Sequence, residues 1–194
     1  MSIEHDYFQR TVGMIREEWF PQHAARIVRY EAPLNGDIHN PPIHSLIWAK
    51  PGTSTYLVRY ILINSTLVVT GDLGSAIYRW GHDKEIGFEW IARCDFCYFA
   101  SKIEGLNRVE LREWCAEVCE LKAREFFGAK FDRNAHWRGA TDFSQEWVKF
   151  IGANQKLFRS WDGCSDAAEW GLVPSNRCIG HWMGLRLAMG VDKP

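Results

Sequence analysis

The segment from residue 44 to residue 80 constrains the fold more than any other part of the chain. It holds four short apolar runs, and the breaks between them are only "PGT" at 51–53, "NS" at 64–65 and "GDLG" at 71–74. Glycine, proline, asparagine and aspartate favour reversals of the backbone. Strands joined by such short turns pair antiparallel, because a parallel pair needs a crossover of roughly a dozen residues. The segment therefore predicts a four-stranded antiparallel meander.

The second of these runs, "STYLVRYILI" at residues 54–63, carries apolar side chains on both of its alternating faces, with Arg59 as the exception. A strand with one face in water normally alternates apolar and polar residues, whereas two apolar faces are typical of a strand buried on both sides. We therefore expect this strand to be central in the sheet.

Helical patterns precede the meander. Apolar residues recur every three to five positions from Ile3 to Trp19, which predicts an amphipathic helix that ends near Pro21. Proline suits the first turn of a helix, so a second short helix is predicted over residues 22–30. Residues 31–42 contain three prolines, a glycine and two asparagines, a composition typical of a loop.

Helical patterns also dominate after residue 80. The strongest covers residues 107–127, where Asn107 and Glu110 have the spacing of a capping box and Gly128 stops the helix. One face of this predicted helix is apolar, and it carries Leu111, Trp114, Cys115, Val118, Leu121 and Phe126. Further helices are predicted over residues 85–94, 98–103, 144–158 and 176–189, the last one starting after Pro174-Ser175 and ending at Gly190.

The bulk composition fits one globular domain. The chain has 194 residues, of which 46% are apolar and 24% charged, values typical of a protein that buries a sizeable core. There is no repeat, low-complexity segment or long linker, so we expect a single α+β domain over residues 1–194. In it, N-terminal helices and a helical C-terminal half pack on the four-stranded antiparallel meander. Ten tryptophans are scattered along the chain, which favours core anchors over one stacking platform.

The charge balance argues against several classes of partner. Lys and Arg (23) nearly cancel Asp and Glu (24), so no strong field would attract DNA or an anionic membrane. Nucleic-acid binding is possible but not favoured. The longest uncharged run, residues 60–71, is too short to span a bilayer. The N-terminus lacks the apolar core of a signal peptide. We therefore expect a cytoplasmic protein with no membrane partner and with its six cysteines reduced.

Four cysteines have a spacing that permits a metal site. Cys94 and Cys97 form a C-x2-C pair, and Cys115 and Cys119 form a C-x3-C pair, which together could bind a structural zinc ion. Zinc pairs usually lie on tight glycine-rich turns, whereas Cys115 and Cys119 fall on the strongest predicted helix. Core thiols are therefore favoured over zinc, and no metal or cofactor is predicted.

Catalytic signatures are missing as well. The sequence has no G-x-S-x-G, no P-loop and no G-x-G-x-x-G after a strand, so no catalytic residue is predicted. His181 lies on an otherwise apolar helix, which favours a core role. Asp72 is the remaining case. An aspartate between glycines is fully explained by the turn, since its side chain can bind backbone amides two residues on. A functional carboxylate would need partners from elsewhere in the chain.

The stretch "GDLGSAIYRW" followed by "FEWIARCDFCYFASKI" resembles a segment of uncharacterised proteins encoded by bacteriophages and prophages. In them, a "GDLG(x)A(V/I)Y(x)W" hairpin precedes "WI(x)(x)(C)D(x)(x)YFASK". The match covers Val68 to Ile103. The resemblance implies only an origin, that of a small phage accessory protein in the host bacterial cytoplasm. It does not mark Asp72, Asp95 or Lys102 as functional residues.

That origin suggests a function. Phage accessory proteins of this kind often bind and block a host protein, and anti-CRISPR proteins are among them. The first hypothesis is therefore a non-enzymatic, protein-binding modulator or inhibitor of a host or defence complex. Its partner-binding surface would include Asp72, Arg79, Trp80, His82 and Asp83. One alternative is a small enzyme acting on a nucleotide or signalling molecule through Asp72, His82 and Asp83. The other is a nucleic-acid-binding protein.

Overall fold

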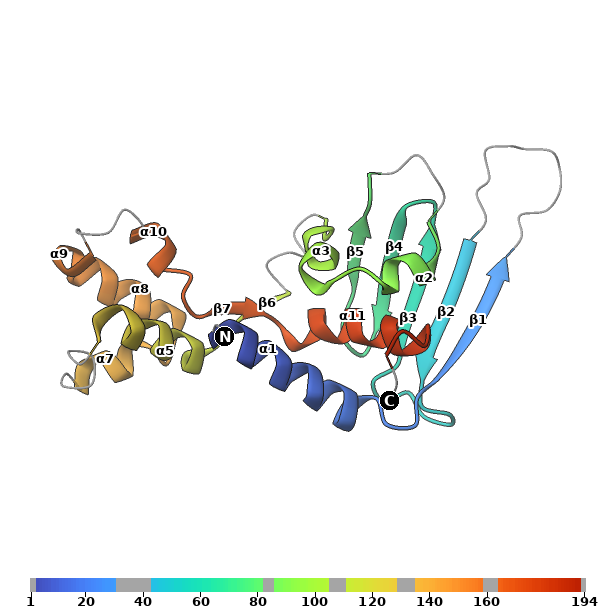
Figure 1. The fold of residues 1–194 in the computed structure, drawn as a ribbon, viewed down its shortest axis with the longest axis horizontal. Helices are drawn as coiled ribbons and strands as arrows, with labels where there is room; N and C mark the ends of the chain where they lie inside the picture. Colours follow the sequence, from blue (N-terminus) through green and yellow to red (C-terminus); the bar gives the residue numbers. More distant parts are fainter. Residues whose placement is uncertain are drawn as a thin grey trace. The chain divides into compact units, whose positions relative to one another are not determined.

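A computed structural model describes residues 3–30, 43–81, 86–104, 111–128, 135–158 and 164–192 (Figure 1). The chain divides into two compact units. The helical unit comprises Met1–Gln9 and Arg112–Pro174, and the sheet unit comprises Arg10–Leu111 and Ser175–Pro194. The single domain expected from the sequence stays a prediction.

The sheet unit is built on five antiparallel strands in the order β1-β2-β3-β4-β5 (Figure 1). They are β1 (Ala24–Tyr30), β2 (Ile43–Ala49), β3 (Val58–Ile63), β4 (Thr66–Gly71) and β5 (Ala76–Arg79). A mixed helix-and-sheet fold with an antiparallel meander is thus confirmed, but the meander has five strands and not four. β3 is the central strand, as its two apolar faces predicted.

The additional strand, β1, corrects the prediction of a second helix over residues 22–30. Gln22 has a left-handed backbone, with φ of 66°, and this conformation breaks any continuation of the preceding helix. The residues that follow then pair with β2, from Ala24 opposite Ala49 to Tyr30 opposite Ile43. Partner strands override weak local propensity in such segments.

One face of the sheet, which we call the inner face, is buried. Its side chains are Leu46, Trp48, Val58, Tyr60, Leu62, Leu67, Val69, Ala76 and Tyr78. α11 (Asn176–Ala188) packs on this face at very short range, because a Cβ atom at Gly184 would lie 2.6 Å from the Tyr60 hydroxyl. Both predicted ends of α11 are confirmed. The Ser175 side chain accepts a hydrogen bond from the Cys178 amide, and Gly190 follows the helix with φ of 68°.

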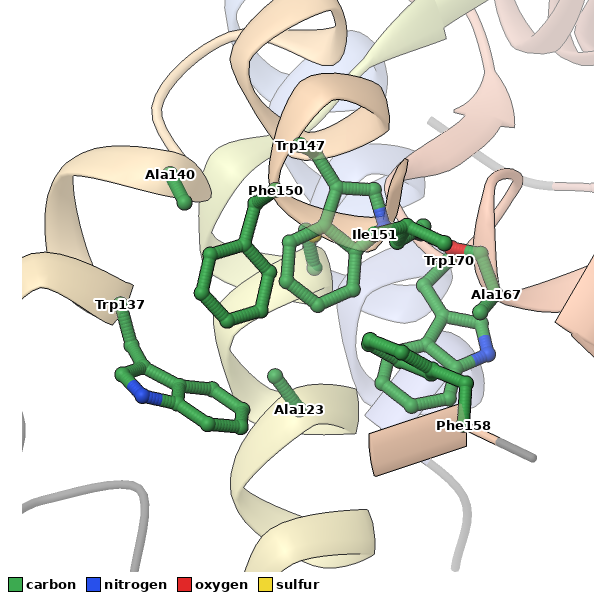
Figure 2. Packing of buried hydrophobic residues seen from close by; sticks show 10 residues of the cluster. Ala123, Trp137, Ala140, Trp147, Phe150, Ile151, Phe158, Ala167 and Trp170 are labelled. Atoms are coloured by element: carbon green, nitrogen blue, oxygen red, sulfur yellow. Dashed lines mark hydrogen bonds between the residues drawn. The ribbon is translucent and has the colours of Figure 1, made fainter. Parts of the chain in front are cut away.

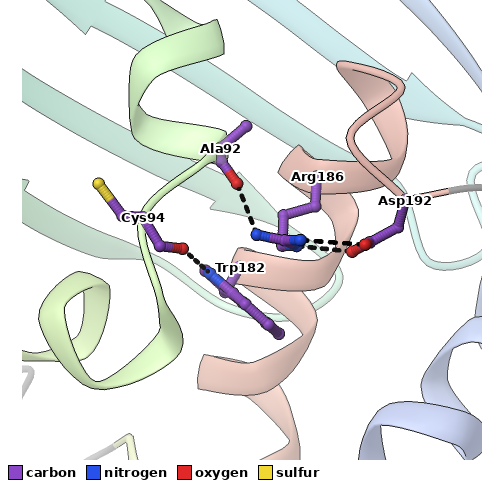
Figure 3. Close-up of polar contacts among 5 residues, drawn as sticks. All are labelled: Ala92, Cys94, Trp182, Arg186 and Asp192. Carbon is purple, nitrogen blue, oxygen red and sulfur yellow. Dashed lines mark hydrogen bonds and ion pairs between the residues drawn. The ribbon is translucent and has the colours of Figure 1, made fainter.

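Two short helices lie beside α11, namely α2 (Phe88–Ala92) and α3 (Phe96–Ser101). Figure 3 shows how α11 is joined to this part of the chain. Trp182 Nε1 donates to the Cys94 carbonyl at 2.9 Å, and Arg186 donates to the Ala92 carbonyl at 3.0 Å. Arg186 also forms a bidentate pair with Asp192, which lowers the pKa of that carboxyl. These contacts fix the position of α2 relative to α11.

The helix predicted from Ile3 is confirmed as α1 (Ile3–Met14), which is followed by the π-helical segment η1 (Ile15–Trp19).

The helical unit contains a two-stranded antiparallel sheet, β6 (Arg112–Trp114) with β7 (Leu172–Pro174). Its other helices are α5 (Ala116–Phe127), α7 (Ala135–Ala140), α8 (Ser144–Ala153), α9 (Gln155–Phe158) and α10 (Cys164–Ala167). Their shared core is largely aromatic (Figure 2), with Trp137, Trp147, Phe150, Phe158 and Trp170 among its buried members.

The helix predicted over residues 107–127 is shorter than expected. Asn107 and Glu110 lie outside the described residues, and the helix that the structure places here, α5, begins at Ala116 after Cys115 as its N-cap. Its end at Gly128 is confirmed, with φ of 58°. The three residues before Cys115 form β6 because β7 gives their backbone a partner. The predicted helix over 144–158 is likewise divided into α8 and α9.

Candidate interaction surface

The "GDLG" turn is shaped by its backbone and by packing on α11. Gly71 has φ of 135°, and a Cβ atom there would collide with the Leu57 carbonyl oxygen. The Asp72 amide donates to that same oxygen at 2.9 Å. Leu73 is buried, and its side chain lies over Gly180 of α11. The Asp72 side chain is exposed, and the hydrogen bonds described for the turn are made by its backbone.

This geometry gives a direct test of which turn residue matters. We expect Gly71→Ala to lower the free energy of unfolding by about 2 kcal/mol, because an L-residue is strained at this φ and its methyl meets backbone that cannot move aside. Asp72→Ala should change it by less than about 0.5 kcal/mol, as is usual for exposed positions. Urea denaturation of both variants measures the difference. A larger loss for Asp72→Ala than for Gly71→Ala would contradict this account.

The predicted partner-binding residues are only partly available at the surface. Asp72 and Arg79 are exposed, and His82 and Asp83 lie outside the described residues. Trp80 is only 1% exposed. Its ring stacks on Tyr78 in the core, with 6.4 Å between ring centroids. The expectation that Trp80 belongs to an exposed aromatic surface is therefore corrected, since its alternation with Arg79 turns it toward the inner face.

Polar side chains do meet inside the sheet unit, but solvent does not reach them. Tyr60 donates its hydroxyl hydrogen to the His181 carbonyl at 2.8 Å, and the Tyr78 hydroxyl lies 3.0 Å from His181 Nδ1. Burial lowers the pKa of His181 to about 4 and raises that of Cys178 to about 12, so both side chains are neutral at pH 7. The core role predicted for His181 is confirmed. These groups join α11 to the sheet and offer a substrate no access.

The four cysteines of the zinc alternative do not share one environment. Cys119 is buried, and burial raises its pKa to about 12, which keeps the thiol protonated. Cys94 and Cys115 are half-buried, and Cys97 is exposed, so the expectation of core thiols is met fully only at Cys119. Within residues 3–30, 43–81, 86–104, 111–128, 135–158 and 164–192, no three His, Cys, Asp or Glu residues are grouped as metal ligands would be.

The most distinctive surface is the second face of the five-stranded sheet, which we call the open face. Side chains alternate along each strand, so residues next to the buried ones point outward, and the cross-strand register aligns them in rows. From Ala24 to Val28 on β1, and on β2 to β5, these residues are half-buried or exposed. Seven are aliphatic and β-branched, namely Val28, Ile43, Ile47, Ile61, Ile63, Val68 and Ile77.

An antiparallel sheet with one solvated face normally carries polar residues on that face. The open face instead carries the exposed Ile43 and Ile77, whose side chains are 39% and 38% exposed. Ile61 and Val68, on the same face, are half-buried. The helices of the sheet unit that bury its core, α11 above all, lie on the inner face. Ser45, Thr66 and Thr70 lie among the aliphatic residues of this face, and the row Ile61, Val68 and Ile77 is its uninterrupted apolar part. Apolar side chains at the surface of a sheet make this face a candidate interaction surface.

Arginines frame the apolar part of the open face. Arg26, Ile47 and Arg59 stand side by side on β1, β2 and β3. Both arginines are exposed, and neither makes an ion pair with a carboxylate among the residues described. Arg79 on β5 lies 3.4 Å from Glu104. Positive charge therefore exceeds negative charge on this face. The expected site residue Arg79 belongs to it, whereas Asp72 lies beyond the end of β4.

No protein-family model, curated protein or solved structure matches this chain. The resemblance of residues 68–103 to phage proteins therefore stays a prediction. Across the described parts of the chain, no helix combines the length and the apolar character needed to cross a membrane.

Proposed function

We propose that this protein is a non-enzymatic binding protein that attaches to the surface of another protein through its open face. If the phage resemblance holds, the partner belongs to a host or defence complex and binding blocks it. The alternatives of a small enzyme and of a nucleic-acid-binding protein are not supported by a specific observation. The described side chains of the open face are aliphatic, small polar or arginine, and none of them is aromatic, whereas unpaired bases are usually held by aromatic side chains.

The observation that carries this proposal is the outward side of β3 and β4. Ile61 lies opposite Val68, and both point away from the buried core. The sequence of β3 is that of a strand covered on both sides, yet one side has no cover among the described residues. A partner protein supplies the second layer that such a sheet face requires.

The charges define the partner's chemistry. Arg26 and Arg59 are exposed next to the apolar rows, and arginines at the edge of an apolar patch are common anchors of protein interfaces. The complementary surface is therefore apolar with carboxylates at its rim. Two copies of this open face would place arginines of both copies in one interface, so self-association is disfavoured.

The double substitution Ile61→Thr with Val68→Thr tests this proposal. Threonine keeps the β-branched shape but removes apolar surface worth about 1 kcal/mol at each position, so binding should weaken at least tenfold, roughly 1.4 kcal/mol. The tagged protein is incubated with bacterial lysate, and retained proteins are quantified by mass spectrometry. The affinity of any retained protein is then measured in purified form against both versions.

A matched control is Val148→Thr with Leu157→Thr, which makes the same kind of change at exposed positions of α8 and α9. This control should bind like the wild type. Arg59→Glu should also weaken binding and should reduce its dependence on salt. The proposal is wrong if no protein is retained, or if the open-face and control variants bind equally well.

A further inference from the structure

The outer edge of β1 is a second feature that the open face does not explain. β1 is the first strand of the sheet, and among the described residues no strand pairs with it on the side away from β2 (Figure 1). The other end of the sheet is protected, since the Arg79 amide donates to the Lys102 carbonyl and the Glu104 amide donates to the Ile77 carbonyl. An exposed edge strand offers unpaired backbone groups to an added strand.

A cavity of about 300 Å³ opens on the inner side of this edge. Ile27 of β1 and His44 of β2 line it from the sheet, and Ile86, Phe88 and Met189 form its apolar wall. Its volume lies at the lower end of the range for small-ligand sites, which is enough for one bulky side chain. Ile27 is 51% exposed although it lies on the inner face, opposite the fully buried Leu46. With respect to the described residues, Ile27 at the edge of the inner face therefore stays accessible beside this cavity.

The alternation of β1 assigns a side-chain chemistry to each position of an added strand. A residue placed beside Ile27 points to the inner face and into the cavity, so it is apolar. Glu89 also lines the cavity and disfavours an acidic residue there. The neighbours beside Arg26 and Val28 point to the open face. An acidic residue pairs with the exposed Arg26, and a β-branched residue packs beside Val28.

We propose that the β1 edge binds an extended peptide segment of another protein as a sixth, antiparallel strand with the order β-branched, bulky apolar, acidic. This mode of recognition takes affinity from backbone hydrogen bonds and specificity from alternate side-chain pockets. The edge site shares Arg26 and Val28 with the open face, whereas the variant tested above changes Ile61 and Val68, which lie on strands inside the sheet.

The probe is the fluorescein-labelled peptide Thr-Lys-Thr-Val-Leu-Asp-Thr-Lys-Thr, titrated with the full chain and followed by fluorescence anisotropy. We expect saturable binding that weakens at least fivefold for Arg26→Glu and for Ile27→Asp. A second peptide with Lys in place of Asp should bind Arg26→Glu at least fivefold more tightly than it binds the wild type. Both substitutions are at exposed positions, and circular dichroism checks that the variants are folded.

Two controls separate strand addition from other modes of binding. Arg93→Glu makes the same charge change at an exposed position after α2 and should leave the affinity unchanged. Peptides N-methylated at one or the other set of alternate residues should differ, because only one set of amides faces β1. The proposal is overturned if the first peptide does not bind below about 1 mM, a free energy near −4 kcal/mol. Equal binding by Arg26→Glu and wild type, or equal effects of both N-methylated sets, would also overturn it. If the Ile61→Thr/Val68→Thr variant loses lysate partners but still binds the peptide, that result concerns the open face and not the β1 edge.

Discussion

Replacing Trp147 with alanine is expected to destabilise the helical unit by about 3–5 kcal/mol, the usual cost of removing a fully buried tryptophan. The ring is completely inaccessible to solvent, and its Nε1 donates to the Ala167 carbonyl at 2.5 Å (Figure 2). The Trp147 ring stacks on Phe150, with 5.6 Å between the ring centroids, and its centroid lies 5.5 Å from that of Trp170. Truncation would therefore leave a cavity among aromatic rings and a buried carbonyl without its donor.

Hydrogen exchange followed by mass spectrometry measures this loss unit by unit. Amides of α5 and α8 should exchange faster in Trp147→Ala, whereas amides of β3 and β4 should not change. Val148→Ala is the matched control, since the neighbouring side chain is 52% exposed, and it should alter stability by less than about 0.5 kcal/mol. Unchanged protection of α5 and α8 in Trp147→Ala would show that this aromatic core does not hold the unit together.

Acidification should destabilise the sheet unit through His181. Its pKa is about 4 in the folded chain, against an ordinary value of 6.5, because burial opposes the charged form and Arg177 repels it. Tyr78, which faces His181, and Cys178, which interacts with Tyr78, stay neutral because burial raises their pKa values. Between pH 6.5 and 4, His181 therefore binds a proton in the unfolded chain but not in the folded chain. The contribution of neutral His181 to the free energy of unfolding is complete above pH 6.5 and falls by about 3 kcal/mol as the pH drops to 4.

The comparison with His181→Asn isolates this effect from the other histidines. Asparagine can still meet the Tyr78 hydroxyl, but it does not titrate in this range. Free energies of unfolding from urea titrations at pH 7, 6, 5 and 4.5 should therefore fall less steeply in the variant. Parallel pH profiles of the two proteins would mean that His181 is not held neutral in the folded state.

Local signals in the sequence predicted those parts of the fold whose structure is locally determined. Ser175 and Gly190 mark the ends of α11, and the tight turns at Gly52 and Gly71 set the meander. β1 was missed because its conformation depends on pairing with β2, which lies beyond residues 31–42 in the chain. The same holds for β6, whose partner β7 comes almost sixty residues later. A strand that forms by pairing with a distant segment has no distinctive pattern in its own local sequence.

The candidate surface was only partly visible in the sequence. The two apolar faces of β3 predict its central position in the sheet, which is confirmed. Which face has no cover depends on where α11 packs, and α11 lies more than a hundred residues along the chain from Tyr60. Arg79 was placed correctly at the surface. Trp80 was not, because an aromatic residue at the end of a strand can point to either face.

The order of the two units along the chain has a consequence for how the sheet unit closes its core. The Leu111 carbonyl accepts a hydrogen bond from the Ser175 amide at 2.8 Å, although residues 112–174 lie between them. Bringing together the ends of a flexible loop of about 60 residues costs on the order of 4 kcal/mol in chain entropy. Within the helical unit, β6 and β7 already hold these ends together. When the helical unit folds first, the pairing of β6 with β7 holds Leu111 and Ser175 close together. The chain entropy that α11 loses on packing against the sheet is then that of closing a short turn, not a loop of about 60 residues.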